Sequence, residues 1–549
     1  MSVFLLIGMV NYIIVTGGVI SGLGKGITTA SIGKILENHG YKVTAIKIDP
    51  YINYDAGTLR PTEHGEVWVT EDGGEIDQDL GHYERFLDIN IPKCNNITTG
   101  QVYSAVIEKE RGGKYLGKTV QPIPHVTDEI KRRIRAPAEE TKFDFVLVEI
   151  GGTVGDYENV LFLEAVRQMK HEGEKVIYVH VTYVPVLKSL GEAKTKPTQH
   201  SVKLLREIGI QPDFIITRSE KPLDDVRKEK IALFCNVSGE DVISDSNIDN
   251  VYGVPLLFEE QELCKKILKK LGLRKEELDL NAWKNYIAKI RKLDKKVKIG
   301  IIGKYFDIGA FKLSDSYISV IEAIKHAAWN NNLHPEIEWI DSKIFEKQPR
   351  KIVNLKKIDG IIVPGGFGLS GVEGKISTIK YARENNIPYL GLCLGMQLAV
   401  VEYARNVCGM KGANTTEVEK NPAYPVIDFI PDQIKIVTES RYGATMRLGA
   451  YPAVLTKGSL IQKLYNDQNK IYERHRHRYE VNPQYVEILE KSGLVFSGRS
   501  PDGILMEFME LPGHPYFVAT QAHPEFKSRP MKPAPLFDGL LKATKKKKE

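Results

Sequence analysis

The chain has 549 residues, of which 42% are hydrophobic and 27% are charged, and its formal net charge is +6. This composition is typical of a globular protein, and the length exceeds what one ordinary core supports, so we expect two domains or more. The small net charge gives no indication of a nucleic-acid partner. The five cysteines show neither zinc spacing nor a disulfide framework, which fits a reducing cytoplasm. No stretch reaches the roughly 18 apolar residues of a membrane span, so we expect no membrane partner.

The first half of the chain, from Tyr12 to about Leu273, alternates short apolar runs with helical patterns. Strands are predicted at 12–15, 43–46, 145–148 and 176–179, and a helix at 29–39. Such alternation predicts an α/β domain with a mainly parallel sheet flanked by helices. The apolar stretch 3–10 lacks a basic flank and a cleavage signal, so we expect it to lead into the first strand. Either Met1 or Met9 could be the start.

A glycine-rich loop, Gly17 to Gly26, follows the first strand and precedes a helix. Glycines leave backbone N–H groups free to face phosphate, the helix N-terminus adds positive potential, and Lys25 can reach the terminal phosphates. The loop is P-loop-like but not a regular Walker A motif, because Gly26 stands where serine or threonine would bind magnesium. The alternative is a glycine-rich loop with a purely structural purpose.

Without that hydroxyl group, magnesium needs another protein ligand. Asp77 and Asp79 are candidates in one acidic segment, and Glu149 ends an otherwise apolar strand. A carboxylate at the end of a parallel strand faces the ligand crevice, and Mg²⁺ prefers one or two carboxylates together with phosphate oxygens. The neighbouring acidic residues Glu71 and Asp72 are typical of a solvated face.

A lysine cluster spans Lys194 to Gln199. Pro197 disfavours a helix there, and two lysines spaced by two can project from one side of an extended segment. Such a pair suits a triphosphate, although loop lysines are usually ordinary surface.

The stretch 274–296 is highly charged, with apolar Leu278, Trp283, Ile287 and Ile290 near helical spacing, and we interpret it as a linker helix. It separates a first domain at 1–273 from a second domain at 297–541, which opens with a strand at 297–302. The basic tail 542–549 is expected to be a solvated, frayed end.

Cys393 is the strongest catalytic candidate. It follows an apolar run at 387–390 and lies between Gly391 and Gly395, a pattern that predicts a strand, a sharp turn and a helix. Such a nucleophile elbow exposes the side chain, and the helix N-terminus favours a thiolate. Later in the chain, His523 and Glu525 complete the order of a triad that attacks amides. The alternative is a small buried cysteine.

These residues resemble class I glutamine amidotransferases, and Val363 to Gly368 resembles the oxyanion loop of that family. Along almost the whole chain, from about Tyr12 to Leu541, the segments resemble the CTP synthase family. The resemblance is carried by 15–21, 47–53, 64–67, 79–86, 149–156, 194–199, 233–237 and 474–480.

The resemblance implies a ligase in which ATP phosphorylates UTP at its 4-oxygen. Ammonia from glutamine is passed between the domains and then aminates C4 to give CTP. It also implies Mg²⁺, GTP as allosteric activator, CTP as feedback inhibitor, and a cytoplasmic homotetramer built as a dimer of dimers, with no nucleic acid.

The family's roles carry over to matching positions of this sequence. The triad is Cys393, His523 and Glu525, and Gly366 and Leu394 N–H groups form the oxyanion hole, while Gln397, Glu417 and Arg478 orient glutamine. ATP would meet Ser21, Gly22, Leu23, Gly24, Lys25, Gly26, Lys47 and Arg218, and Asp79 and Glu149 would hold magnesium. UTP or CTP would meet Ser21, Asp156, Tyr157, Glu158, Lys194, Lys196, Gln199, Lys230 and Phe234.

Some positions depart from the family pattern. Tyr157 replaces a smaller aliphatic residue, and Asn247 stands where an aspartate often meets adenine. The loop 306–314 is longer than usual and 431–444 is shorter than in bacterial relatives, which puts GTP activation in question.

Two rival functions remain open. One is another ATP-dependent amidotransferase, such as a cobyrinic acid amidase, against which the lysine cluster argues. The other is a regulatory protein that has kept the fold but not the chemistry.

Overall fold

The structure is a computed structural model that describes residues 10–60, 64–187, 191–274, 280–303, 307–308, 311–312, 314–366, 370–429 and 446–548. The possible start at Met9, the loop 431–444 and parts of 306–314 lie outside these ranges. The chain forms two compact units. The first unit holds residues up to 56 together with 79–287, and the second holds 57–78 and 288 onward. The segment 57–78 thus belongs with the second half of the chain.

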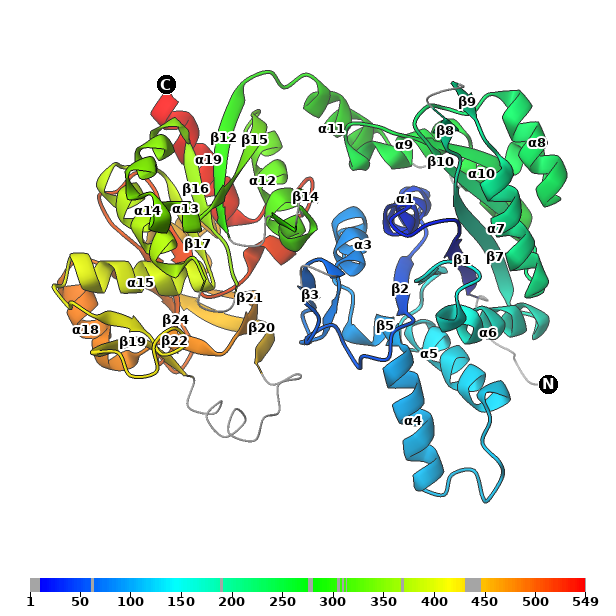
Figure 1. Cartoon of the computed structure of the whole chain (residues 1–549), viewed down its shortest axis with the longest axis horizontal. Helices are drawn as coiled ribbons and strands as arrows, with labels where there is room; N and C mark the ends of the chain where they lie inside the picture. The colour runs from blue at the N-terminus through cyan, green and yellow to red at the C-terminus, as the bar shows by residue number, and fades with distance from the viewer. Residues whose placement is uncertain are drawn as a thin grey trace. The chain divides into compact units, whose positions relative to one another are not determined.

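The first unit is built on a seven-stranded sheet in the order β11-β10-β7-β1-β6-β2-β5 (Figure 1). Every pairing in it is parallel. Each predicted strand is present. The strands are β1 Asn11–Gly17, β2 Val43–Asp49, β5 Asn96–Thr98, β6 Phe145–Ile150, β7 Lys175–Tyr183, β10 Phe214–Ser219 and β11 Val242–Ser246.

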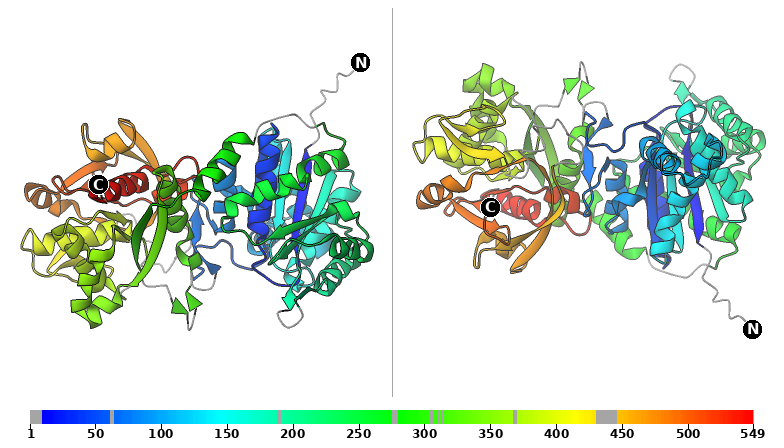
Figure 2. Two further views of the ribbon diagram at one scale, coloured as in Figure 1. Left: turned by 90° about the horizontal axis from the view of Figure 1, so that it is seen from above. Right: turned by 90° about the horizontal axis from the view of Figure 1, so that it is seen from below.

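Helices flank both sides of this sheet (Figure 2). Ile14 and Val148 belong to the apolar core formed with α4 to α7, whereas α1 and α3 adjoin the other face. The helices are α1 Lys25–Asn38, α3 Asp79–Leu87, α4 Thr99–Arg111, α5 Thr127–Glu140, α6 Val160–His171, α7 Lys196–Glu207, α8 Asp225–Cys235, α9 Val254–Glu260, α10 Leu263–Leu271 and α11 Asn281–Arg291.

One local prediction in this unit is wrong. The cluster Lys194 to Gln199 is not an extended segment, because α7 begins at Lys196. Pro197 lies in the first turn of that helix, where its missing N–H group costs no intrahelical hydrogen bond. Within the expected linker 274–296 the structure has the helix α11, and its Trp283 is buried with Nε1 donating to the Tyr252 carbonyl at 2.8 Å.

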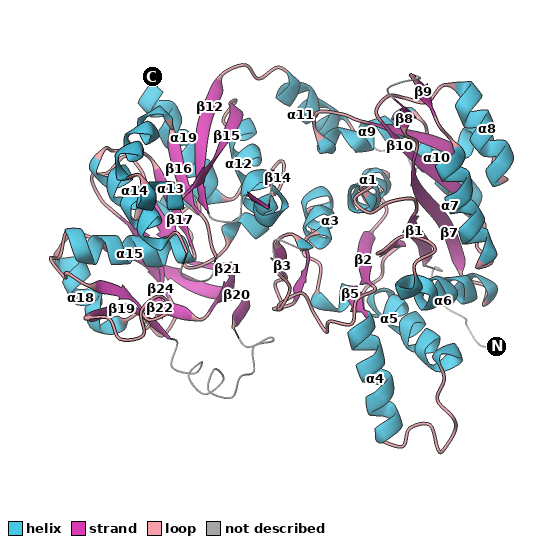
Figure 3. Cartoon of the chain, in the orientation of Figure 1, coloured by secondary structure: helices cyan, strands magenta, loops and turns pink. Residues whose placement is uncertain are grey.

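The second unit contains a nine-stranded sheet in the order β15-β12-β16-β17-β25-β24-β23-β20-β21 (Figure 3). The pairings from β15 to β25 are parallel, and those from β25 to β21 are antiparallel. The strands are β12 Lys296–Gly303, β15 His334–Asp341, β16 Gly360–Val363, β17 Tyr389–Leu392, β20 Arg447–Leu455, β21 Lys470–His477, β23 Val495–Arg499, β24 Met506–Glu510 and β25 Phe517–Thr520.

Two apolar cores cover the faces of this sheet, one with α14 and α15 and the other with α12 and α19. The helices are α12 Ile318–Asn330, α13 Lys343–Lys347, α14 Val372–Glu384, α15 Leu394–Asn406, α17 Leu460–Leu464, α18 Pro483–Lys491 and α19 Pro535–Lys548. Helix α19 continues to Lys548, so it includes part of the basic stretch 542–549, and its Leu540, Leu541 and Thr544 are buried.

The segment 57–78 forms a hairpin, β3 Val67–Val69 and β4 Glu75–Asp77, within the second unit. The Trp68 ring lies 5.0 Å from that of Phe526. Glu71 is not part of a solvated face, since its Oε1 accepts a hydrogen bond from Nε of the fully buried Arg474 at 3.0 Å. A three-stranded sheet completes the unit, with β18 Ala413–Thr415, β19 Tyr424–Phe429 and β22 Tyr479–Val481. Within the described ranges, no helix combines the length and the apolar character that a membrane crossing requires.

Candidate active sites

Three neighbouring parallel strands of the second unit bring the predicted glutaminase residues to one edge of the sheet. Val363 of β16 pairs with Gly391 of β17, and Leu392 of β17 pairs with Thr520 of β25. The carboxyl ends of these strands are therefore adjacent. The glycine pair of the oxyanion loop, Cys393 and His523 all follow within a few residues of those ends, where ligands of open α/β sheets bind.

Cys393 occupies the predicted sharp turn. Its backbone has φ 50° and ψ −104°, an unusual conformation for a residue with a side chain. Its N–H group donates to the Thr520 carbonyl at 2.8 Å, which ties the turn to β25. A Cβ atom on Gly391 would lie 2.7 Å from the Tyr389 hydroxyl oxygen, and one on Gly395 would lie 2.1 Å from the Val363 carbonyl oxygen. The two flanking glycines are therefore required by close packing.

His523 and Glu525 are paired next to this turn. His523 Nδ1 lies 2.7 Å from Glu525 Oε1. Burial alone would lower the pKa of His523, but the carboxylate of Glu525 and the sulfur of Cys393 together raise that pKa to about 10. A histidine that stays protonated beside a cysteine favours a thiolate–imidazolium pair. A Cβ atom on Gly365 would lie 2.8 Å from His523 Cε1 and 3.6 Å from Cys393 Cβ, so both side chains border the same glycine.

A cavity of about 470 Å³ opens over these residues, entirely within the second unit. The predicted residues Cys393, His523, Glu525, Gly366 and Arg478 line it. The 57–78 segment, which sequence reasoning placed in the other domain, also lines it. The remaining lining residues are Gly57, Thr58, Leu59, Arg60, Glu66, Val67, Ser316, Tyr317, Val320, Pro364, Gly365, Met446, Arg476 and Phe526.

The other predicted glutamine-site residues lie close by. Leu394 is the first residue of α15, directly after the nucleophile. Gln397 Nε2 donates to the Tyr479 carbonyl at 3.0 Å. Burial, and after it the negative charge of Glu417, raises the pKa of Tyr479 to about 12. Sequence reasoning missed Gln521, whose Nε2 lies 3.6 Å from the Cys393 sulfur. Its position two residues before His523, in the same motif, was the available signal.

In the first unit, two of the predicted charged residues, Lys47 and Glu149, lie side by side on neighbouring strands of the sheet. Val15 of β1, Glu149 of β6 and Lys47 of β2 are register partners, so their side chains share one face. Lys47 Nζ lies 3.0 Å from Glu149 Oε1 and also contacts Asp79, the first residue of α3. Burial raises the pKa of Glu149, whereas at Asp79 the lysine outweighs burial and the pKa is lowered.

The glycine loop meets this cluster at Gly26. A Cβ atom there would lie 2.4 Å from Asp79 Oδ1, so the missing side chain allows the carboxylate to approach the loop. Lys25 Nζ donates to the Gly152 carbonyl at 2.8 Å. Two carboxylates beside a glycine loop and two lysines form a donor set that fits Mg²⁺ with phosphate. Two unpredicted residues join the cluster: Asp49, 3.7 Å from Lys47 Nζ, and Tyr83, which donates to Glu149.

The predicted nucleotide residues are more dispersed. Arg218 pairs with Asp245 and Asn247, each at 3.0 Å. Lys194 pairs with Glu192 at 2.6 Å. Tyr157 is 96% exposed and Phe234 is 55% exposed, so both residues are accessible to a ligand. Of the others, Asp156 accepts from the Thr153 N–H group, Gln199 donates to Thr195, and Ser21, Glu158 and Lys230 lie on the surface.

Comparisons with known proteins agree with this two-part organisation. A family profile described as CTP synthase N-terminus matches residues 11–273, and one described as class I glutamine amidotransferase matches 312–543. The CTP synthase of Pyrococcus abyssi is 58% identical over 98% of this chain and 99% of its own. That of Methanocaldococcus jannaschii is 55% identical over 98% of each chain.

A solved structure, the glutaminase domain of Trypanosoma brucei CTPS with bound acivicin, is 39% identical over 46% of this chain and 94% of its own, with a TM-score of 0.42. The near-complete coverage of the two archaeal relatives, above half identity, decides the assignment. The chain belongs to the CTP synthase family.

Proposed function

We propose that this protein catalyses the ATP-dependent amination of UTP to CTP with ammonia taken from glutamine. The observation that carries the proposal is the presence of two complementary sites in one chain. The second unit holds a cysteine, a histidine and a glutamate around a cavity. The first unit holds a glycine loop with lysines and carboxylates suited to a triphosphate.

The glutaminase step begins with attack of the Cys393 thiolate on the carboxamide carbon of glutamine. The oxyanion that forms is stabilised by N–H groups of Gly366 and Leu394. Protonated His523, held by Glu525, gives its proton to the departing nitrogen, and ammonia leaves a thioester on the cysteine. His523 then takes a proton from water, which hydrolyses the thioester to glutamate and restores the thiolate.

The synthetase step transfers the γ-phosphoryl group of ATP to the 4-oxygen of UTP and releases ADP. Ammonia attacks C4, and inorganic phosphate leaves with the former 4-oxygen, so that CTP results. Lys25 and Lys47 would hold the phosphates, and Asp79 and Glu149 would hold magnesium. When bound, Mg²⁺ neutralises charge on the transferring phosphoryl group.

Regulation and assembly form a second part of the proposal. CTP would inhibit by sharing the triphosphate positions of Lys194, Lys196, Gln199 and Lys230, and GTP would activate glutamine hydrolysis. The active form would be a homotetramer, a dimer of dimers. The exposed rings of Tyr157 and Phe234 support a surface role in ligand or subunit contacts.

One assay tests the central proposal. The purified protein is incubated with UTP, ATP and magnesium, with either glutamine or ammonium chloride, and CTP is separated and quantified. We expect CTP from both nitrogen sources. No CTP from either source, in a preparation that still hydrolyses glutamine, would contradict the assignment of UTP as acceptor.

A further inference from the structure

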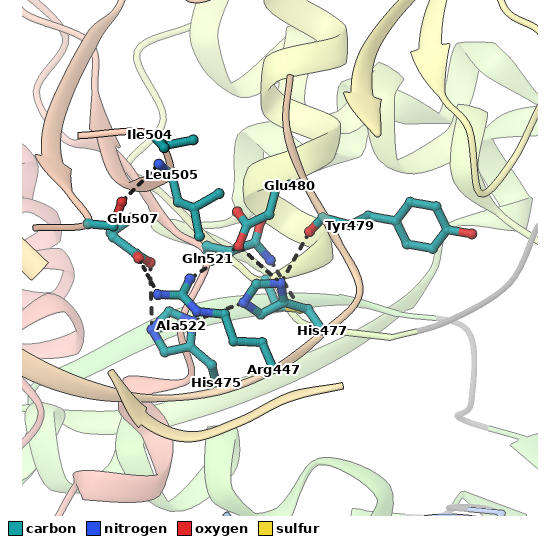
Figure 4. Close-up of polar contacts among 12 residues, drawn as sticks. Arg447, His475, His477, Tyr479, Glu480, Ile504, Leu505, Glu507, Gln521 and Ala522 are labelled. Atoms are coloured by element: carbon teal, nitrogen blue, oxygen red, sulfur yellow. Dashed lines mark hydrogen bonds and ion pairs between the residues drawn. The ribbon is translucent and has the colours of Figure 1, made fainter. Parts of the chain in front are cut away.

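A buried polar cluster of five residues lies in the second unit, on β20, β21, β22 and β24 (Figure 4). Its members, Arg447, His475, His477, Glu480 and Glu507, are at most 9% exposed. The proposed chemistry uses none of them. Burying so many polar groups is costly unless they are paired, so their arrangement needs an explanation.

The main-chain carbonyl of Tyr479 fixes the direction of the hydrogen bonds, because a carbonyl can only accept. His477 Nδ1 lies 3.2 Å from that oxygen and must therefore carry a proton. Burial, followed by the charge of Arg447, lowers the pKa of His475 and His477 well below the usual value, so both rings are neutral. His477 Nε2 then accepts from His475 Nδ1, 3.0 Å away.

The donor and acceptor roles of His475 also bear on Glu507. His475 Nε2 is left as an acceptor and faces Glu507 Oε2 at 3.6 Å, an oxygen that has no hydrogen-bond partner among the described residues. Burial raises the pKa of Glu507 and raises that of Glu480 well above its usual value, so one of the two carboxyl groups holds a proton. Placed on Glu507 Oε2, that proton makes this contact attractive. Arg447 donates to Glu507 Oε1 at 2.6 Å and to Glu480 Oε1 at 3.1 Å. With one carboxyl group protonated, the whole cluster is neutral.

On its other side, the Tyr479 carbonyl orients two glutamines. The carbonyl accepts a hydrogen bond from Gln397 Nε2 at 3.0 Å, so the NH₂ end of the Gln397 amide faces the carbonyl. Gln397 Nε2 also donates to Gln521 Oε1 at 3.3 Å. The Nε2 group of the fully buried Gln521 must then point the other way, and it lies 3.6 Å from the Cys393 sulfur.

We propose that Gln521 is a further catalytic residue of glutamine hydrolysis, as an N–H donor that stabilises the Cys393 thiolate. Hydrogen bonds to a charged partner are stronger than those to a neutral one, so this donor favours the thiolate both as nucleophile and as leaving group. His475 and His477 are positioning residues, because they hold the carbonyl that orients the glutamines. The inference rests on the proposed glutaminase activity and names the residue that donates a hydrogen bond to its thiolate.

The test replaces Gln521 by leucine, which has a similar size but no donor. The matched control is Gln462→Leu, which removes another buried amide, 5% exposed, elsewhere in the second unit. Two rates are measured: glutamine hydrolysis, and alkylation of Cys393 by iodoacetamide, followed by peptide mass spectrometry. We expect Gln521→Leu to slow both by about tenfold or more, as for loss of a hydrogen bond to a charged group, and the control to change neither by more than about twofold.

The thermal unfolding midpoint of each variant reports folding of the second unit, and ammonia-dependent CTP formation should stay at the wild-type level. If Gln521→Leu does not fold, Gln521→Met is used in its place, since methionine has a similar length and no N–H donor. Wild-type alkylation rates in a folded Gln521 variant would overturn the inference. Wild-type protein without glutamine hydrolysis would instead overturn the proposed function.

The positioning role has its own test in two variants of His477. Asparagine can donate to the Tyr479 carbonyl from the position of Nδ1, whereas leucine cannot. We expect His477→Leu to slow Cys393 alkylation severalfold and His477→Asn to restore most of the rate. Equal rates in the two variants would remove His477 from this role.

Discussion

Cys393 has a strained backbone and follows β17, which lies between β16 and β25. A residue held in a sparsely populated conformation costs on the order of 1–3 kcal/mol, and it persists only where the surroundings determine it. Here the determinants are the N–H bond to Thr520 and the two glycines, Gly391 and Gly395, that pack without side chains. The cysteine is therefore presented to the cavity by packing rather than by its own preference.

The first prediction concerns this residue. Cys393→Ala should abolish glutamine-dependent CTP formation and keep ammonia-dependent formation near the wild-type rate, because the sulfur serves only glutamine hydrolysis. Both rates are measured from the appearance of CTP. Cys408→Ala, in the same unit, is the matched control and should keep both activities. Loss of both activities in folded Cys393→Ala protein would contradict the two-site proposal.

Single residues could be predicted from the sequence where they stand in a short, recognisable motif. Cys393, His523 and Glu525 stand in short segments whose glycines and order indicate the chemistry. Gln521 could not be assigned in the same way, because its role depends on a carbonyl of β22 and on Gln397 in a different element. Tyr83 was missed for a similar reason, since its partner Glu149 lies 66 residues away in the chain.

At the scale of elements, the apolar runs predicted the parallel strands well, because strands buried on both faces are continuously apolar. The pattern was weaker elsewhere. Pro197 suggested an extended segment, yet a proline in the first turn is compatible with α7. The hairpin 67–77 also packs within the second unit, and no local pattern shows which core a hairpin will join.

The second prediction concerns the junction between the glycine loop, α1 and α3. Gly26→Ala places a methyl carbon 2.4 Å from the present position of Asp79 Oδ1 and should displace that carboxylate. We expect CTP formation from either nitrogen source to fall by about a thousandfold, the order of loss when charge stabilisation at a phosphoryl group is removed. Lys25→Ala, Asp79→Ala and Glu149→Ala should lose the same activities.

Glutamine hydrolysis is the internal control for these four variants, because the triad belongs to the other unit. It should remain measurable in each of them. A variant with near-normal ammonia-dependent turnover would remove its residue from the proposed phosphate and magnesium site.

At the scale of the whole molecule, feedback requires UTP and CTP to be distinguished although their triphosphates are the same. Lys194 and Lys196 cannot provide that difference. The 4-amino group of CTP donates where the 4-oxygen of UTP accepts, and a site built for one leaves a buried group unpaired with the other. We therefore propose a separate pocket for the product's base, bordered by Asp156, Glu158 and Phe234.

The last prediction tests that pocket. Glu158→Lys reverses the charge of an exposed residue, and it should raise the CTP concentration needed for half inhibition more than it raises the UTP concentration needed for half-maximal rate. Both values are measured in one ammonia-dependent assay, which leaves glutamine hydrolysis out of the comparison. Glu207→Lys, an exposed glutamate at the end of α7, is the matched control and should change neither value. Equal shifts in both values for Glu158→Lys would mean that the two bases share one pocket, since the charge would then act on both nucleotides alike.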